Sequence, residues 1–204
     1  MSDITLYFSP FSRSYTARWM LEELGIRYRV ATIDIRKGDH KRSEYLLVNP
    51  MGKVPALTDG EVLVTESPAI CMYLADRYSY GTLAPRIEAP ERGTYLRWMV
   101  FSTAVLEPTL ITGPEAADAQ TASARGWGNH ADVMRTLHGA LANGPWLLGE
   151  SFSAADVMMG SVLGFAVFNK RITNEPVIEA YVQRVAARPA QARAAAFTWT
   201  PDAQ

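Results

Sequence analysis

The feature that most constrains the fold is a change of hydrophobic period near the start of the chain. Residues 4–8, "ITLYF", alternate apolar and polar side chains as a strand does. Residues 14–24 repeat apolar positions at helical spacing, and Gly25 follows where a helix would end. Residues 28–33, "YRVATI", alternate again. This order predicts two parallel strands joined by a right-handed helical crossover.

A hairpin and another helix are expected next. A polar, basic connector (36–44) leads to "VPAL" and "VLV", which are separated by "TDGE". The turn signal at residues 58–60 predicts an antiparallel pair. A helix is then expected over residues 68–78. The whole segment reads as βαβ followed by ββα, an α/β domain covering residues 1–80.

The second half of the chain has a different character. Residues 81–89 contain glycine and proline, break both periods and are interpreted as a linker. Beyond them the sequence is alanine-rich and helical, which predicts an all-α domain over residues 90–204. Helices are expected at about 90–112, 118–142, 154–168 and 175–187.

Composition excludes several classes of function. The 204 residues carry a net charge of −1, so no general attraction to nucleic acid or to an anionic membrane is expected. No apolar segment approaches the roughly 20 residues that span a bilayer. The start of the chain lacks the pattern of a signal peptide, so a cytoplasmic location is expected. One cysteine and three histidines without a metal-binding spacing predict neither a disulfide nor a metal site.

Val54-Pro55 places a proline inside an apparent strand. Because proline lacks the N–H that the sheet needs, it marks either an ordinary edge strand or a cis bond. A cis bond would leave the backbone of Val54 available to an extended, peptide-like ligand. The local sequence leaves both alternatives open.

Glu66-Ser67-Pro68 has the pattern of a helix start, with serine before proline at the first turn. In one interpretation the serine is only a cap. In the other, the free N–H groups attract a carboxylate, and Glu66 accepts a hydrogen bond from an ammonium group. An α-amino acid head would satisfy both.

The loop "SPFSRSYT" (9–16) places hydroxyl groups and a cation near a helix N-terminus. Ser9, Ser12, Ser14 and Arg13 are the residues concerned. A thiol that meets a hydroxyl donor and the positive end of a helix dipole ionises more easily. The alternative is a polar loop with a serine cap.

Taken together, four segments resemble the cytosolic glutathione transferase family over nearly the whole chain, in the manner of a bacterial, serine-type or beta/theta-like member. The segments are "SPFSRSYTARWMLEELG" (9–25), "NPMGKVPAL" (49–57), "ESPAICMYLADRY" (66–78) and "FSAADV" (152–157). The resemblance implies a thioredoxin-like first domain, an all-helical second domain and glutathione as co-substrate.

The resemblance also implies roles for individual residues. A cis Pro55 would let the backbone of Val54 pair with the cysteinyl part of glutathione. Glu66 and Ser67 would hold its γ-glutamyl end. Lys53 would reach the glycine carboxylate.

Further contacts are implied less directly. His40 or Lys41, in the connector, would add a second positive contact to the glycine carboxylate. Arg13 is placed with the glutathione contacts, and it stands where beta-class members carry their cysteine. Mixed-disulfide chemistry in this loop is therefore not expected.

The family activates the thiol with a tyrosine, serine or cysteine, depending on class. Ser12 lies near the position of the theta-like serine and is the first candidate here. Ser9, before the proline as in tau-type enzymes, is the second. Tyr7 is the third, although it shares a strand face with Thr5 and has packing as its alternative.

The function expected from this resemblance is conjugation of glutathione to small hydrophobic electrophiles by a homodimer. Glutathione-dependent reduction of peroxides or disulfides, and a non-catalytic binding or regulatory role, are the alternatives. The electrophile pocket is expected between the domains. Its candidate residues are Phe11, Met99, Thr103, Leu106, Phe197 and Trp199.

Two other residues have structural interpretations. Ser153 and Asp156 have capping-box spacing, which makes Asp156 a structural acid rather than a catalytic one. Cys71, on an apolar helix, is expected to be buried.

Overall fold

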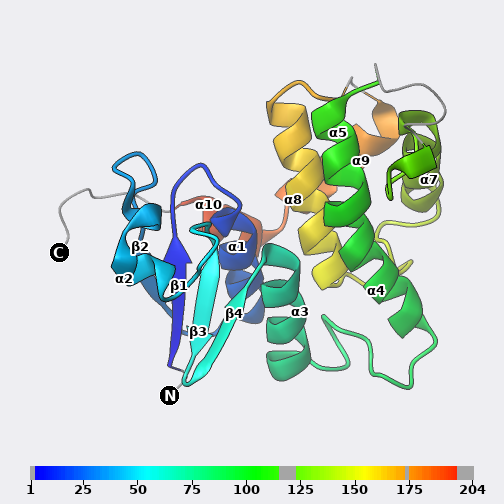
Figure 1. The fold of residues 1–204 in the computed structure, drawn as a ribbon. Helices are drawn as coiled ribbons and strands as arrows, with labels where there is room; N and C mark the ends of the chain where they lie inside the picture. The colour runs from blue at the N-terminus through cyan, green and yellow to red at the C-terminus, as the bar shows by residue number, and fades with distance from the viewer. Residues whose placement is uncertain (1–2, 115–122, 173–174, 197–204) are drawn as a thin grey trace. The chain divides into compact units, whose positions relative to one another are not determined.

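A computed structural model describes residues 3–114, 123–172 and 175–196 (Figure 1). These residues form two compact units. One contains residues 3–79 together with 188–196, and the other contains the described part of residues 80–187. No helix in the described ranges is long and apolar enough to cross a membrane.

The first unit is built on a mixed four-stranded sheet. Its strands are β1 (Ile4–Phe8), β2 (Arg29–Thr32), β3 (Ala56–Asp59) and β4 (Val62–Thr65), in the spatial order β2-β1-β3-β4. β1 pairs with β2 in parallel, and β3 is antiparallel to both β1 and β4. The predicted parallel pair and the predicted hairpin are both confirmed.

Helices cover both faces of this sheet. α1 (Ser14–Leu24) and α3 (Ser67–Tyr78) pack against each other on one face, and the short α2 (Ser43–Leu46) lies on the other (Figure 1). α1 ends where the sequence predicts, because Gly25 adopts a left-handed conformation with φ of 62°. The βαβ–ββα order defines a thioredoxin-like domain.

The helical unit contains α4 (Glu91–Phe101), α5 (Glu107–Thr112), α7 (His130–Ala142), α8 (Ala154–Phe168) and α9 (Pro176–Ala186). A π-helical turn, η2 (Ser102–Leu106), joins α4 to α5. Pro108 accounts for this turn, because its ring cannot fit against a regular preceding helical turn. The helix expected over residues 118–142 is confirmed only in its second half, where α7 covers His130–Ala142. Residues 125–129 are not helical, and residues 115–122 lie outside the described ranges.

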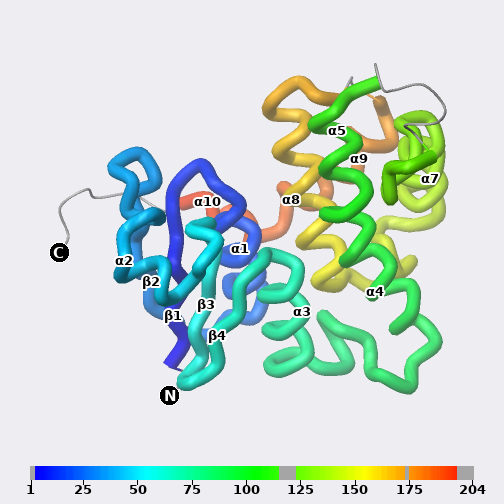
Figure 2. Tube along the Cα trace, viewed as in Figure 1, coloured from blue at the N-terminus to red at the C-terminus, as the bar shows by residue number. Residues whose placement is uncertain are grey.

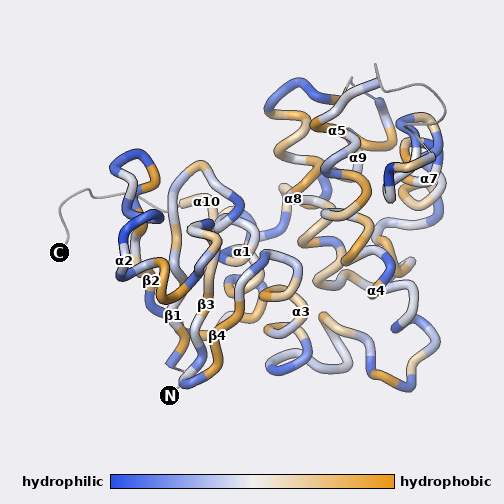
Figure 3. The backbone as a smooth tube through the Cα atoms, in the orientation of Figure 1, coloured by the Kyte–Doolittle hydropathy of each residue, from blue (hydrophilic) through white to orange (hydrophobic). Residues whose placement is uncertain are grey.

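α8 forms the centre of the helical unit, and apolar residues dominate its length (Figure 3). The predicted capping box at its start is present: Ser153 caps the helix, and the carboxylate of Asp156 accepts from the backbone N–H of Ser153 at 2.9 Å. That carboxylate also accepts from the N–H of Leu147 and the hydroxyl of Tyr181, each at 2.9 Å. Burial raises the pKa of Asp156, and these hydrogen bonds oppose the shift. Asp156 is therefore a structural acid, as predicted.

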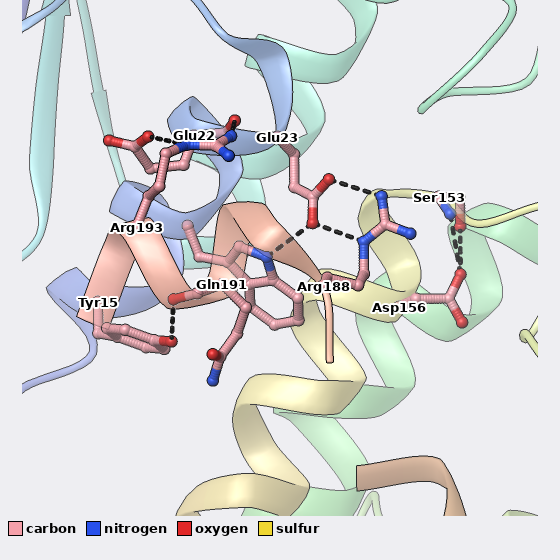
Figure 4. Close-up of polar contacts among 9 residues, drawn as sticks. Tyr15, Glu22, Glu23, Ser153, Asp156, Arg188, Gln191 and Arg193 are labelled. Atoms are coloured by element: carbon pink, nitrogen blue, oxygen red, sulfur yellow. Dashed lines mark hydrogen bonds and ion pairs between the residues drawn. The ribbon is translucent and has the colours of Figure 1, made fainter. Parts of the chain in front are cut away.

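A last helix, α10 (Pro189–Ala195), lies alongside α1, as the red and blue tubes of Figure 2 show. Arg188 forms two hydrogen bonds to the carboxylate of Glu23, at 2.6 and 2.7 Å (Figure 4). Arg193 pairs with Glu22 at 3.0 Å. Its position in the sequence predicts that this segment belongs to the helical domain, whereas its contacts group it with residues 3–79.

Candidate functional site

Strand register brings the predicted site segments to one edge of the sheet. Tyr7 pairs with Ala56, and Ala56 pairs with Thr65. β1 and β4 therefore end at the edge where β3 begins. The residues just beyond these pairs include Ser9 and the segments around Val54 and Ser67. Both α1 and α3 begin at this edge, so two helix N-termini meet there.

The bond between Val54 and Pro55 is cis, as the family resemblance implied, and the ordinary trans proline is not what the structure contains. Pro55 is buried and Val54 is half-buried. Among the described residues, neither backbone hydrogen-bonding group of Val54 has a partner. This position therefore offers one donor and one acceptor to a ligand.

Glu66 has a backbone conformation that is unusual for a residue with a side chain. Its φ is 66° and its ψ is 123°, at the position just before α3. Such conformations strain the backbone by about 1–3 kcal/mol and cluster at binding sites. No side-chain hydrogen bond caps the helix, Ser67 is half-buried, and Glu66 is exposed. The start of α3 is thus open to an anion.

The serine loop forms a closed set of hydrogen bonds. The hydroxyl of Ser12 donates to the carbonyl oxygen of Ser9 at 2.6 Å, and it accepts from the N–H of Ser14 at 3.1 Å. Its oxygen lies 2.7 Å from that of Ser14. Because Ser12 has one hydrogen, which goes to Ser9, the hydroxyl of Ser14 is the donor between the two. Ser14 in turn accepts from the N–H of Ser9 at 3.2 Å.

The other two thiol-activating candidates are Ser9, which is buried, and Tyr7, which is half-buried like Ser12. Ser9 is 2% exposed. The ring of Tyr7 packs against the ring of Tyr45, with centroids 5.8 Å apart, on the face of the sheet that carries α2. This contact matches the packing alternative for Tyr7.

Phe11 lies in the same loop and is 92% exposed, with φ of 56°. The guanidinium of Arg36 lies 5.8 Å from its ring centroid. Arg13 is the half-buried residue just before α1. An exposed aromatic ring in a strained loop is therefore available at this edge of the sheet.

The connector brings positive groups beside the turn that precedes Val54. Lys41 is the last residue of the short 3₁₀ helix η1 (Asp39–Lys41), and its ammonium donates to the carbonyl of Met51 at 3.1 Å. Gly52 has φ of 57°, and an added Cβ would lie 2.6 Å from the carbonyl oxygen of His40. The two segments are thus in close contact. Lys53, two residues from Met51, is exposed.

Sequence reasoning missed two residues of this region. Tyr45 and Asn49 both donate hydrogen bonds to the carbonyl oxygen of Lys53. The Asn-Pro pair at 49–50 is a turn signal that points to this place. No sequence pattern indicated that the side chain of Asn49 turns inward.

Two of the three described pocket candidates in the helical unit are core side chains. Met99 and Leu106 are fully buried, and Thr103, in the π-helical turn, is half-buried. Phe197 and Trp199 lie outside the described residues. Cys71 is buried as expected, and burial raises the pKa of its thiol. Within the described ranges no group of three or more His, Cys, Asp or Glu side chains is placed to hold a metal ion.

A thioredoxin-like domain in which α3 has an open start beside Val54, followed by a helical unit, agrees with the comparisons. The family model "Glutathione S-transferase, N-terminal domain" matches residues 2–76. The curated relative "Disulfide-bond oxidoreductase YfcG" of Escherichia coli is 32% identical over 205 residues, covering 94% of each chain. The chain belongs to the glutathione S-transferase family.

Solved structures agree with this assignment. A glutathione transferase from Methylococcus capsulatus is 31% identical with a TM-score of 0.76, and the match covers 94% of this chain and 96% of that one. The theta class glutathione S-transferase of Xanthomonas axonopodis pv. citri, solved with glutathione bound, is 30% identical with a TM-score of 0.75. That match covers 98% of this chain and 100% of the other.

Proposed function

We propose that this protein is a glutathione transferase that joins reduced glutathione to small hydrophobic electrophiles. One observation carries the proposal: α1 and α3 both begin at the sheet edge where the backbone of Val54 is unpaired. Two positive helix ends beside a free donor and acceptor suit an extended, anionic peptide. The Xanthomonas relative, solved with glutathione bound, supports this ligand.

The ligand would lie along this edge with each part meeting a different group. The γ-glutamyl end would dock on Ser67 and the start of α3, with its ammonium against Glu66. The cysteinyl part would pair with the backbone of Val54. The glycine carboxylate would meet Lys53 and His40, which the close packing of the connector places near this turn. This order matches the charges of glutathione, which has an ammonium and a carboxylate at its γ-glutamyl end, an uncharged middle and a carboxylate at its glycine end.

The thiol would then lie near the start of α1. Ser12 is the first candidate for the hydroxyl that stabilises the thiolate, followed by Ser9 and Tyr7. In the structure the hydroxyl of Ser12 donates to the carbonyl oxygen of Ser9. Binding would therefore have to turn this hydroxyl toward the sulfur. Lowering the thiol pKa by about two units corresponds to about 2.7 kcal/mol of differential stabilisation.

A second candidate function is glutathione-dependent reduction of disulfides or peroxides. The relationship to a protein named disulfide-bond oxidoreductase favours it. In disulfide reduction, the glutathione thiolate attacks one sulfur of the substrate, the other sulfur leaves as a thiolate, and a second glutathione resolves the mixed disulfide. Cys71 is buried, so a protein thiol is not available for this exchange. A purely binding or regulatory role is the remaining alternative.

Calorimetry followed by parallel assays tests these alternatives. Reduced glutathione is titrated into the protein, and turnover is measured with 1-chloro-2,4-dinitrobenzene, a small aromatic disulfide and cumene hydroperoxide. Binding with turnover of the chlorinated arene is expected. Turnover of the disulfide or peroxide alone would favour the second function. Binding without turnover would favour the regulatory role, and absence of heat at millimolar glutathione would overturn the proposed ligand. The homodimer and the cytoplasmic location stay predictions.

A further inference from the structure

The carbonyl oxygen of Lys53 accepts two hydrogen bonds from buried side chains. The hydroxyl of Tyr45 donates at 2.6 Å, and the amide nitrogen of Asn49 donates at 2.8 Å. Tyr45 is 4% exposed and Asn49 is 2% exposed. A carbonyl oxygen has two acceptor positions, so both are filled. This peptide group is therefore fixed on its carbonyl side.

Asn49 is itself held in one orientation. Its side-chain oxygen accepts from the N–H of Met51 at 3.1 Å, so its NH₂ group is the end that faces Lys53. Its backbone carbonyl accepts from the N–H of Gly52 at 2.8 Å, and its own N–H donates to the carbonyl of Tyr45 at 2.9 Å. The turn at 49–53 is thus organised around one buried amide.

We propose that Tyr45 and Asn49 are positioning residues that direct the N–H of Val54 at the bound tripeptide. The Lys53–Val54 bond is trans, and in a planar trans peptide the N–H points away from the carbonyl. Fixing the carbonyl of Lys53 inward therefore fixes the N–H of Val54 in the opposite direction. Rotating this peptide would break two buried hydrogen bonds. The inference rests on the proposed function, because it assigns a ligand to that N–H.

The surroundings of Tyr45 keep its hydroxyl protonated, so that it can donate its hydrogen bond to the carbonyl of Lys53. Burial raises its pKa to about 12, so the phenol keeps its hydrogen across the physiological range. The ring of Tyr7 packs against the ring of Tyr45 with centroids 5.8 Å apart. This contact holds the hydroxyl in place.

Two variants and one matched control test the inference. Tyr45→Phe keeps the ring but removes one donor to Lys53. Asn49→Asp keeps the acceptor for Met51 but replaces the donor with a carboxylate oxygen that repels the carbonyl. The control, Tyr73→Phe, removes a tyrosine hydroxyl that donates to Asp59 at 2.9 Å in the same unit.

The measurement is the Kd of S-hexylglutathione by calorimetry, with circular dichroism as the check on folding. Loss of one hydrogen bond to a positioning group corresponds to a rise in Kd of about five- to tenfold. We expect that rise for both variants and a change below about twofold for the control. Equal affinity in the wild type and in the folded variants would overturn the inference, as would an equal loss in the control. If Asn49→Asp does not fold, Tyr45→Phe carries the test.

Failure of the proposed function gives a different result, namely a wild type that does not bind S-hexylglutathione. The positioning claim is then tested on the free protein by the ¹⁵N–¹H resonance and the hydrogen-exchange rate of the Val54 amide. A change in Tyr45→Phe and Asn49→Asp that is absent in Tyr73→Phe supports it. An unchanged Val54 amide overturns it.

Discussion

The hydroxyl hydrogen of Ser12 is donated to the carbonyl oxygen of Ser9, 2.6 Å away, while the Ser12 oxygen receives hydrogen bonds from Ser14. All three hydrogen-bonding positions of the Ser12 hydroxyl are therefore occupied by groups of its own loop. Ser12 is thus expected to activate a thiol, and it also holds residues 9–14 together through its hydrogen bonds. These two roles predict different consequences for substitutions at Ser12 and Ser14.

Ser12→Ala is expected to lower kcat with the chlorinated arene by about tenfold or more and to raise the apparent pKa of the bound thiol. The reason is the loss of the hydroxyl hydrogen that is proposed to turn toward the sulfur. Affinity for glutathione is expected to change less. The thiol pKa is measured from the absorbance of the bound thiolate as a function of pH.

Ser14→Ala is the matched control for Ser12. It removes a fully buried hydroxyl that bridges Ser9 and Ser12, so it is expected to reduce the free energy of unfolding by about 1–2 kcal/mol. The thiol pKa is expected to stay near that of the wild type. If Ser12→Ala keeps its turnover, Ser9 becomes the first candidate and Tyr7 the second.

Glu66→Gly is expected to stabilise the protein by about 1 kcal/mol while weakening glutathione binding. Glycine adopts φ of 66° without the steric strain that a side chain causes. This relief of strain is expected to outweigh the larger conformational entropy that glycine loses on folding. The carboxylate proposed to meet the ligand ammonium is lost at the same time. Urea denaturation and calorimetry measure the two effects.

Glu61→Gly serves as the control, because Glu61 is an exposed turn residue without a positive φ. That change is expected to destabilise slightly and to leave binding unaltered. Stabilisation by both glycine variants, or unchanged binding in Glu66→Gly, would contradict the prediction.

Arg188→Ala is expected to lower the free energy of unfolding by about 2–3 kcal/mol. The carboxylate of Glu23, whose side chain is 5% exposed, would lose this cation and keep the hydrogen bond from the indole N–H of Trp19 at 2.8 Å. Faster amide exchange is expected across α10. Urea denaturation and hydrogen exchange give the two readouts.

Arg193→Ala removes the neighbouring pair with Glu22, in which the Arg193 side chain is 54% exposed. Solvent screens this pair more strongly, so a smaller effect is expected. Equal losses in the Arg188 and Arg193 variants would show that burial of the carboxylate does not decide the contribution.

Tyr45 predicts a stability change at alkaline pH. Its pKa is raised to about 12 by burial in the native state and is about 10 in the unfolded chain. Between these values the native state holds a proton that the unfolded state has lost, so the free energy of unfolding falls as pH rises from about 10. Tyr45→Phe is expected to show a shallower fall in urea midpoint between pH 9 and 11.5. An unchanged slope would contradict this assignment.

Local sequence patterns were sufficient to predict the strands and helices of the first domain and their order along the chain. The alternation in "ITLYF", the glycine at 25 and the turn at 58–60 each act through neighbours in sequence, and the structure confirms all three. The capping box at Ser153 is equally local. Such features are set by backbone conformation and by hydrogen bonds that span a few residues.

Other features depend on contacts between distant segments. α10 packs on α1, although its position in the sequence suggests that it belongs to the helical domain. The reason is that Arg188 and Arg193 bind the carboxylates of Glu23 and Glu22, which lie 165 and 171 residues earlier in the chain. The double hydrogen bond on Lys53 likewise needs Tyr45 to turn inward beneath Tyr7.

The sequence by itself therefore determined the strands and helices of the first domain, their order, and the segments proposed to line the candidate site. The tertiary structure decided which side chains in those segments form hydrogen bonds within the protein and which can contact a ligand. The physical reason is that a hydroxyl or amide satisfies its hydrogen bonds with whatever group the folded chain brings within reach. Ser12 and Asn49 look alike as polar loop residues, and only their neighbours in space tell their roles apart.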